Sequence, residues 1–128
     1  MILALFAAAA AAAPVPVREP LATFHLPKDK SVHQVEVMRV QFLPGQAMPR
    51  HVHPAPVVCL VQAGAFTAKI GDAPETRYAT GEATFEPAGV VIGYFRNVSA
   101  TEPATLVCAF LAGAEDRTLS TMLPEPPR

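Results

Sequence analysis

Short apolar runs, separated by turns that contain glycine and proline, make up most of the chain. Residues 57–61 are continuously apolar, as in a strand buried on both faces or nearly so, whereas residues 65–70 alternate between apolar and polar. No segment after the first 13 residues sustains a helical period. The pattern predicts an all-β fold, a single antiparallel sandwich or barrel. The expected strands cover residues 32–42, 57–61, 65–70, 83–86, 90–96 and 104–111.

The alternation within residues 32–42 changes parity part-way along the segment. Val35 and Val37 share one parity, whereas Met38 and Val40 share the other. A slip of one residue moves all later side chains of a strand to the opposite face of its sheet. We therefore predict a β-bulge in this strand.

An apolar leader opens the chain. Residues 1–13 carry no charged side chain and end in a run of alanines suited to signal-peptide cleavage. Pro14 and Pro16 end the stretch short of the roughly 20 apolar residues that a membrane-spanning helix needs. We predict a signal peptide, a periplasmic or secreted protein, and no stable membrane span in the mature chain. Because no Lys or Arg precedes the apolar core, a misassigned start or an alanine-rich tail is the alternative.

Beyond the leader, the chain divides into three parts. Residues 14–19 are rich in proline and form an expected linker, and residues 20–123 have the size of one domain with its own core. Residues 124–128 form a proline-rich tail. The net charge of −1 provides no basic surface of the kind that phosphate backbones require, so we predict no nucleic-acid partner.

Two cysteines, Cys59 and Cys108, each lie inside an apolar run. In an exported protein an even count permits one disulfide. Two buried free thiols would suit the same apolar surroundings. The residues themselves leave both alternatives open.

Two histidines, His51 and His53, are the first candidates for chemistry. Residues two apart on a strand point to the same face, so the two imidazoles could converge on one divalent ion. A polar stripe or a hydrogen-bonded pair would show the same spacing. The sequence around the pair decides between these interpretations.

Residues 45–64 (GQAMPRHVHPAPVVCLVQAG) resemble the first motif of the cupin superfamily. That motif has a glycine, five residues, the H-x-H pair, a glutamate after three or four more residues, and a closing glycine. Gly45, His51, His53 and Gly64 fall on it.

Residues 81–97 (GEATFEPAGVVIGYFRN) resemble the second cupin motif, with Gly81, Pro87 and Gly89 in place. The resemblance covers about residues 20–123 and implies a jelly-roll β-barrel. It also implies that Cys59 and Cys108 are cross-strand neighbours that could form a disulfide, and that a homodimer forms through outer strands.

The same resemblance shows two departures from the metal-binding pattern. The glutamate of the first motif falls on Val57, and the histidine of the second falls on Ile92. Metal-binding cupins hold iron, manganese, nickel or zinc with three histidines and that glutamate, so only His51 and His53 remain as metal ligands. Two neutral imidazoles bind a cation weakly. We therefore expect no cofactor or, if one is bound, a divalent transition metal (Fe, Mn, Ni or Zn).

Other side chains could complete the site. Tyr94 and Arg96 share the parity of Ile92 and could face the same cavity, where Arg96 would hold an anion. Cys59 could supply a thiolate. Glu86 is the nearest acid, but it precedes Pro87, so we expect it to point outward.

Three functions fit these residues. The leading hypothesis is a binding barrel that takes a small molecule without a full metal site, because Val57 and Ile92 make the cavity more apolar. The second is a metal-dependent enzyme, dioxygenase-like or isomerase-like, that uses His51 and His53 with an atypical third ligand. The third is a structural or dimer-forming barrel. The sequence leaves catalysis undecided and leans against it, and the expected cavity residues are His51, His53, Val57, Cys59, Ile92, Tyr94 and Arg96.

Overall fold

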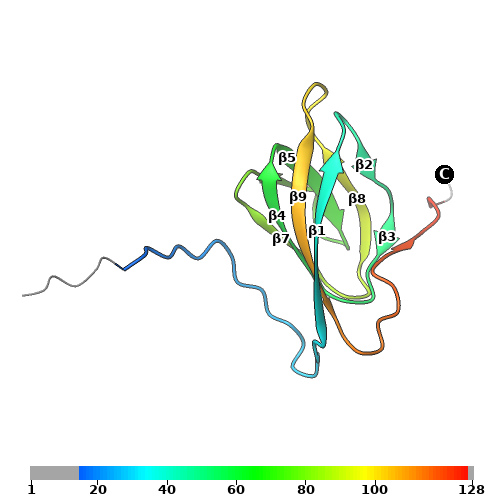
Figure 1. Cartoon of the computed structure of the whole chain (residues 1–128). Helices are drawn as coiled ribbons and strands as arrows, with labels where there is room; N and C mark the ends of the chain where they lie inside the picture. The colour runs from blue at the N-terminus through cyan, green and yellow to red at the C-terminus, as the bar shows by residue number, and fades with distance from the viewer. Residues whose placement is uncertain (1–14, 127–128) are drawn as a thin grey trace, which may run out of the picture.

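The computed structural model describes residues 15–126. The predicted signal peptide, residues 1–13, therefore lies outside the described residues, as do the last two residues of the tail. Residues 15–18 run as an exposed, extended segment away from the body of the molecule (Figure 1), whereas Glu19, Pro20 and Leu21 lie beside residues 76–78 and 81–83 of the barrel. The described part of the chain contains no helix, and so none that could span a membrane.

Two antiparallel sheets face each other and enclose the core (Figure 1). One has the strand order β1-β9-β4-β7, and the other has the order β10-β3-β8-β5-β6 with β2 paired to β8. The prediction of an all-β jelly-roll barrel is confirmed. The strands are β1 (Gln34–Phe42), β2 (Ala47–Met48), β3 (His51–Val52), β4 (Val57–Ala63), β5 (Ala65–Ile70), β6 (Thr76–Ala79), β7 (Ala83–Glu86), β8 (Val91–Asn97), β9 (Ala104–Ala112) and β10 (Thr121–Met122).

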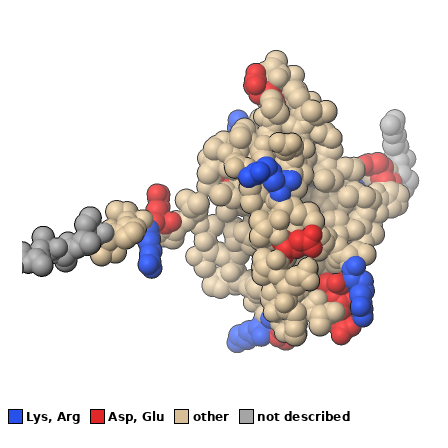
Figure 2. Space-filling view, in the orientation of Figure 1, with Lys and Arg blue, Asp and Glu red and all other residues tan. Residues whose placement is uncertain are grey.

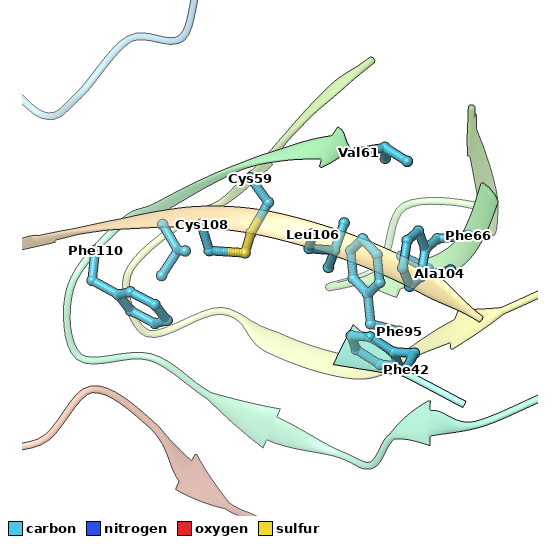
Figure 3. Close-up of a cluster of buried hydrophobic side chains, with 11 residues drawn as sticks. Phe42, Cys59, Val61, Phe66, Phe95, Ala104, Leu106, Cys108 and Phe110 are labelled. Atoms are coloured by element: carbon cyan, nitrogen blue, oxygen red, sulfur yellow. A yellow bond between two sulfur atoms is a disulfide. The ribbon is translucent and has the colours of Figure 1, made fainter. Parts of the chain in front are cut away.

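The apolar core lies between the sheets and is densest at one end of the barrel. Phe66 is fully buried and contacts the rings of Phe42 and Phe95, with centroids 5.0 and 5.3 Å away (Figure 3). Alternate residues of β9 and β4 supply the rest of this core, because side chains at even spacing share one face of a strand. Burial of these side chains joins the two sheets.

The strand β1 contains no bulge, so that prediction was wrong. Its pairing with β9 runs without interruption from Gln34 to Phe42. Val35 and Val37 are 54% and 63% exposed, on the outer face of the sheet, and Leu60 of β4 is also exposed on its sheet. The change of parity thus reflects apolar residues on both faces of β1.

The homodimer expected from the resemblance stays a prediction.

A register shift does occur in β8. Its pairing with β5 moves by one residue between Lys69 and Ile70, so that Ile92 and Phe95 are both buried although they are three residues apart. Gly93 lies in the irregular stretch, where a Cβ atom would come 3.1 Å from the side chain of Lys69. The bulge reverses the parity of every residue that follows.

Cys59 and Cys108 form a disulfide that links β4 to β9 (Figure 3). The two residues are direct partners in the register of these neighbouring strands. Of the two alternatives left open by the sequence, the structure has the disulfide. Both cysteines are buried on the inner face of the sheet that contains β4 and β9.

Charged side chains are scattered singly or in small groups among neutral residues on the face that Figure 2 shows. Lys30 and Asp116, which are far apart in the sequence, form an ion pair of 3.1 Å.

Two glycines allow a matched test of the turn geometry. Gly64 and Gly45 both have positive φ, +80° and +68°, but a Cβ atom on Gly64 would lie 2.7 Å from Cβ of Ala104, whereas Gly45 has open space. Gly45→Ala should lower the free energy of unfolding by about 1–2 kcal/mol through backbone strain. Gly64→Ala should cost about 1–3 kcal/mol more through overpacking. Equal losses in chemical denaturation would contradict the predicted role of the Gly64–Ala104 contact.

Candidate metal centre

His51 and His53 lie at the end of the barrel where β3 meets β8. His51 pairs with Ile92 in the register of these strands, and His53 follows directly after β3. Both side chains are buried and point to the space between the sheets, with ring centroids 4.8 Å apart. The spacing of two residues thus places both imidazoles on the same face of the chain, as predicted for a strand.

Backbone carbonyls fix the orientation of both imidazoles. Nδ1 of His51 donates to the carbonyl of Pro49 at 2.7 Å, and Nδ1 of His53 donates to that of Leu119 at 2.7 Å. Because a carbonyl oxygen only accepts, each Nδ1 carries the proton, and each Nε2 is left as the metal-binding atom. Histidines that bind metals show this same arrangement.

Glu86 is the third member of the cluster. Its carboxylate is buried, and one oxygen, Oε2, lies 2.9 Å from Nε2 of His53 and 3.6 Å from Nε2 of His51. The glutamate comes from the end of β7 and the histidines come from the opposite sheet. The cluster therefore spans the space between the two sheets.

The pKa values of the cluster reflect this contact. Burial alone would lower the pKa of His53, but hydrogen bonds with Glu86 and Leu119 and the charge of Glu86 outweigh it and raise the pKa. Burial alone would raise the pKa of Glu86, but the hydrogen bonds and charges of the two histidines lower it. The metal-free site thus favours a carboxylate beside a protonated imidazole.

The inward position of Glu86 differs from the outward one expected. Thr84 and Glu86 are the buried residues of β7, and Glu86 is the direct register partner of Val57 on β4. The carboxylate therefore comes from the strand beside the position at which the resemblance expected it. The register of β4 with β7 fixes this orientation, and the sequence alone does not give that register.

The other expected cavity residues divide into two groups. Val57 and Cys59 line the cavity next to the histidines, whereas Ile92 is buried in the wall outside the cavity lining. Tyr94 and Arg96 face outward: Tyr94 hydrogen-bonds Glu75 and Arg96 is exposed. Their expected parity with Ile92 fails because the β8 bulge intervenes.

The cavity beside the cluster is small and mostly apolar. Its volume is about 70 Å³, enough for a molecule of a few non-hydrogen atoms. Among the described residues that line it, the only titratable side chains are the three of the cluster. Its walls are Val40, Phe42, Met48, Val57, Phe95, Leu106, Phe110, Ser120, Met122 and the Cys59–Cys108 disulfide.

A family model described as Cupin domain (Cupin_2) matches residues 38–110, more than half of the chain. This chain is a member of the cupin family. The predicted resemblance is confirmed. In this cupin, His51, His53 and Glu86 form a cluster that could hold a metal ion.

Solved structures share the fold. An oxalate oxidase in complex with the substrate analogue glycolate is 28% identical, with a TM-score of 0.56, and the match covers 61% of this cupin and 42% of the oxidase. The protein TT1209 from Thermus thermophilus is 35% identical, with a TM-score of 0.51, over 57% of this chain and 68% of its own. A conserved protein with a double-stranded β-helix domain from Klebsiella pneumoniae is 21% identical, with a TM-score of 0.58, over 71% of this chain and 76% of its own.

The match thus spans less than half the length of the oxalate oxidase. No curated protein matches the chain. The comparisons support the fold and the family, and the chemistry of the site rests on its own geometry.

The three side chains of the cluster are close enough together to share a single metal ion. Their ligand atoms all lie within 4.8 Å of one another. Two atoms bound to one ion at about 2.1 Å lie about 3.0 Å apart at a right angle and about 3.4 Å apart at the tetrahedral angle. The two separations from the imidazoles to Glu86, 2.9 and 3.6 Å, bracket these values, so His51, His53 and Glu86 form a possible transition-metal site.

The pKa shifts predict how the stability of the metal-free protein depends on pH. The raised pKa of His53 stabilises the folded protein. This contribution is fully present below pH 6.5, the ordinary pKa of histidine, and is lost as the pH rises through the raised pKa. The lowered pKa of Glu86 also stabilises the folded protein. This contribution is fully present above pH 4.5, the ordinary pKa of glutamate, and is lost as the pH falls through the lowered pKa. With a chelator present, the free energy of unfolding of the wild type should exceed that of Glu86→Gln by about 1.5–3 kcal/mol between pH 4.5 and pH 6.5. The difference should be smaller at lower and at higher pH.

Thermal unfolding across the pH range measures this difference. Glu102→Gln, which changes an exposed acid, is the control and should follow the wild type. A difference between wild type and Glu86→Gln that does not vary with pH would contradict the prediction.

Proposed function

We propose that this cupin is a metal-dependent protein that binds a small anion at a divalent transition metal held by His51, His53 and Glu86. The observation that carries the proposal is the convergence of two imidazole Nε2 atoms, each fixed by a carbonyl bond at Nδ1, on one buried carboxylate oxygen. The proposal takes its metal site from the second function predicted from the sequence, the metal-dependent enzyme, with Glu86 as the atypical third ligand. It takes its small-molecule ligand from the first, the binding barrel. It replaces the metal-free binding barrel, which was argued on the premise that two histidines stand alone.

Two histidines and one carboxylate are a ligand set known for non-haem iron and for zinc. Manganese and nickel belong to the same group of divalent metals expected for cupins. When bound, such a metal supplies a Lewis acid with open positions for a small ligand. The protein supplies the charge of Glu86 and two imidazoles whose tautomers are already set.

The charge of the site supports a monoanion as its ligand. A divalent ion and the carboxylate of Glu86 together carry one net positive charge, and the described residues of the cavity lining add no further ionised group. An isolated charge in apolar surroundings is unfavourable, so a ligand with a single negative charge is preferred. The apolar walls suit a small uncharged remainder. The similar oxalate oxidase that holds glycolate, a small carboxylate, supports the same ligand class.

Metal binding is tested on protein loaded in turn with iron, manganese, nickel or zinc and then desalted. We expect close to one equivalent of at least one metal in the wild type. His51→Ala, His53→Ala and Glu86→Ala should each lose most of the bound metal, because the two remaining ligands hold a metal ion weakly.

Exposed residues of the same types serve as controls for these variants. His25→Ala and Glu102→Gln should bind metal like the wild type, because both side chains are exposed and outside the cluster. Equal metal content in wild type and in all three cluster variants would refute the proposed site.

The ligand class is tested with a pair of molecules that differ mainly in charge. At a hundred times its Kd, glycolate should add about 2.7 kcal/mol to the free energy of unfolding of the metal-loaded protein, which is measured as a rise in Tm. Neutral glycolamide should raise the Tm much less. Neither should act on chelated protein. An equal response to both molecules would contradict the charge argument.

A further inference from the structure

The disulfide forms part of the wall of the metal cavity. Both of its cysteines line the cavity together with the three side chains of the cluster. Sγ of Cys59 lies 3.9 Å from Oε1 of Glu86, the carboxylate oxygen that does not contact the histidines. Cys59 follows Val57 by two residues on β4, and both are buried on the side that faces the cavity.

This contact places the sulfur beside the carboxylate of the site, on the side of Oε1 and not of the Oε2 that contacts the histidines. If Glu86 bound a metal through both oxygens, Oε1 at about 2.1 Å and a sulfur at about 2.3 Å from the same ion would lie about 3.6 Å apart at the tetrahedral angle. A disulfide sulfur is neutral and is not a normal metal ligand, whereas a thiolate is a strong one. The disulfide thus keeps a potential ligand beside the site in an inactive form.

We propose that Cys59 becomes a fourth protein ligand of the metal when the Cys59–Cys108 disulfide is reduced. The proposal rests on the proposed metal site of His51, His53 and Glu86. Reduction by a dithiol breaks the S–S bond, transfers two electrons and two protons to give two thiols, and leaves the reductant as a disulfide. The thiol of Cys59 then releases its proton when it binds the metal.

The geometry assigns this role to Cys59 and not to Cys108. Cys59 is the cysteine with a contact to Glu86, whereas Cys108 is its partner on β9. A site with three protein ligands keeps a position open for a small molecule, and a fourth protein ligand closes it. The oxidised protein would therefore bind its anion, and the reduced protein would hold its metal more tightly and bind the anion less.

Single cysteine variants separate the ligand from the loss of the disulfide. Cys108→Ser leaves Cys59 as a free thiol without any reductant, and Cys59→Ser leaves Cys108 free. Both lose the same cross-link, so their Tm should fall by a similar amount. Any difference in metal binding between them then reports on the identity of the remaining thiol.

Cobalt(II) provides a readout that does not depend on activity. Thiolate bound to cobalt gives an intense charge-transfer absorption in the near ultraviolet, and nitrogen and oxygen ligands do not. We expect this absorption, and at least a tenfold lower Kd for cobalt, in Cys108→Ser. Cys59→Ser and the oxidised wild type should show only the weak visible bands of cobalt. Absence of the charge-transfer absorption in Cys108→Ser, or its equal presence in Cys59→Ser, would overturn the proposal.

The same experiment distinguishes this inference from the proposed function. Cobalt bound by the oxidised wild type and lost in Glu86→Ala supports the three-ligand site whatever the cysteines do. If Cys108→Ser does not fold, wild type reduced with a phosphine takes its place, because the phosphine becomes its oxide and adds no thiolate of its own. Wild type reduced in this way must then gain the absorption, and a spectrum unchanged by reduction would overturn the proposal.

Discussion

A buried carboxylate held between two imidazoles is the contact on which the site depends. Glu86 comes from one sheet and His51 and His53 from the other, so the cluster forms only when the sheets pack face to face. A buried charge without partners would be costly, and here the two histidines offset that cost. A divalent metal would replace the proton that the metal-free cluster holds between His53 and Glu86.

The core at the other end of the barrel and the disulfide keep this contact in place. The rings around Phe66 join the sheets, and the Cys59–Cys108 bond fixes β4 to β9 (Figure 3). Because β4 also pairs with β7, the same bond indirectly sets the position of Glu86 opposite Val57. Site geometry and fold stability therefore share the same strands.

Much of this could be predicted from the sequence. The apolar runs gave most of the strands, and the spacing of Gly45, His51 and Gly64 gave the family and the histidine pair. Glu86 was missed because its orientation depends on the pairing of β4 with β7, which a linear pattern does not contain. Tyr94 was misplaced because the bulge in β8 changes parity without a clear mark in the sequence.

Anomalous diffraction from crystals loaded with a divalent transition metal tests the central claim most directly. We predict one strong peak within about 2.0–2.3 Å of Nε2 of His51, Nε2 of His53 and a carboxylate oxygen of Glu86. Nδ1 of each histidine should keep its bond to a backbone carbonyl. A peak bound elsewhere, or an empty cluster in crystals of fully loaded protein, would contradict the account.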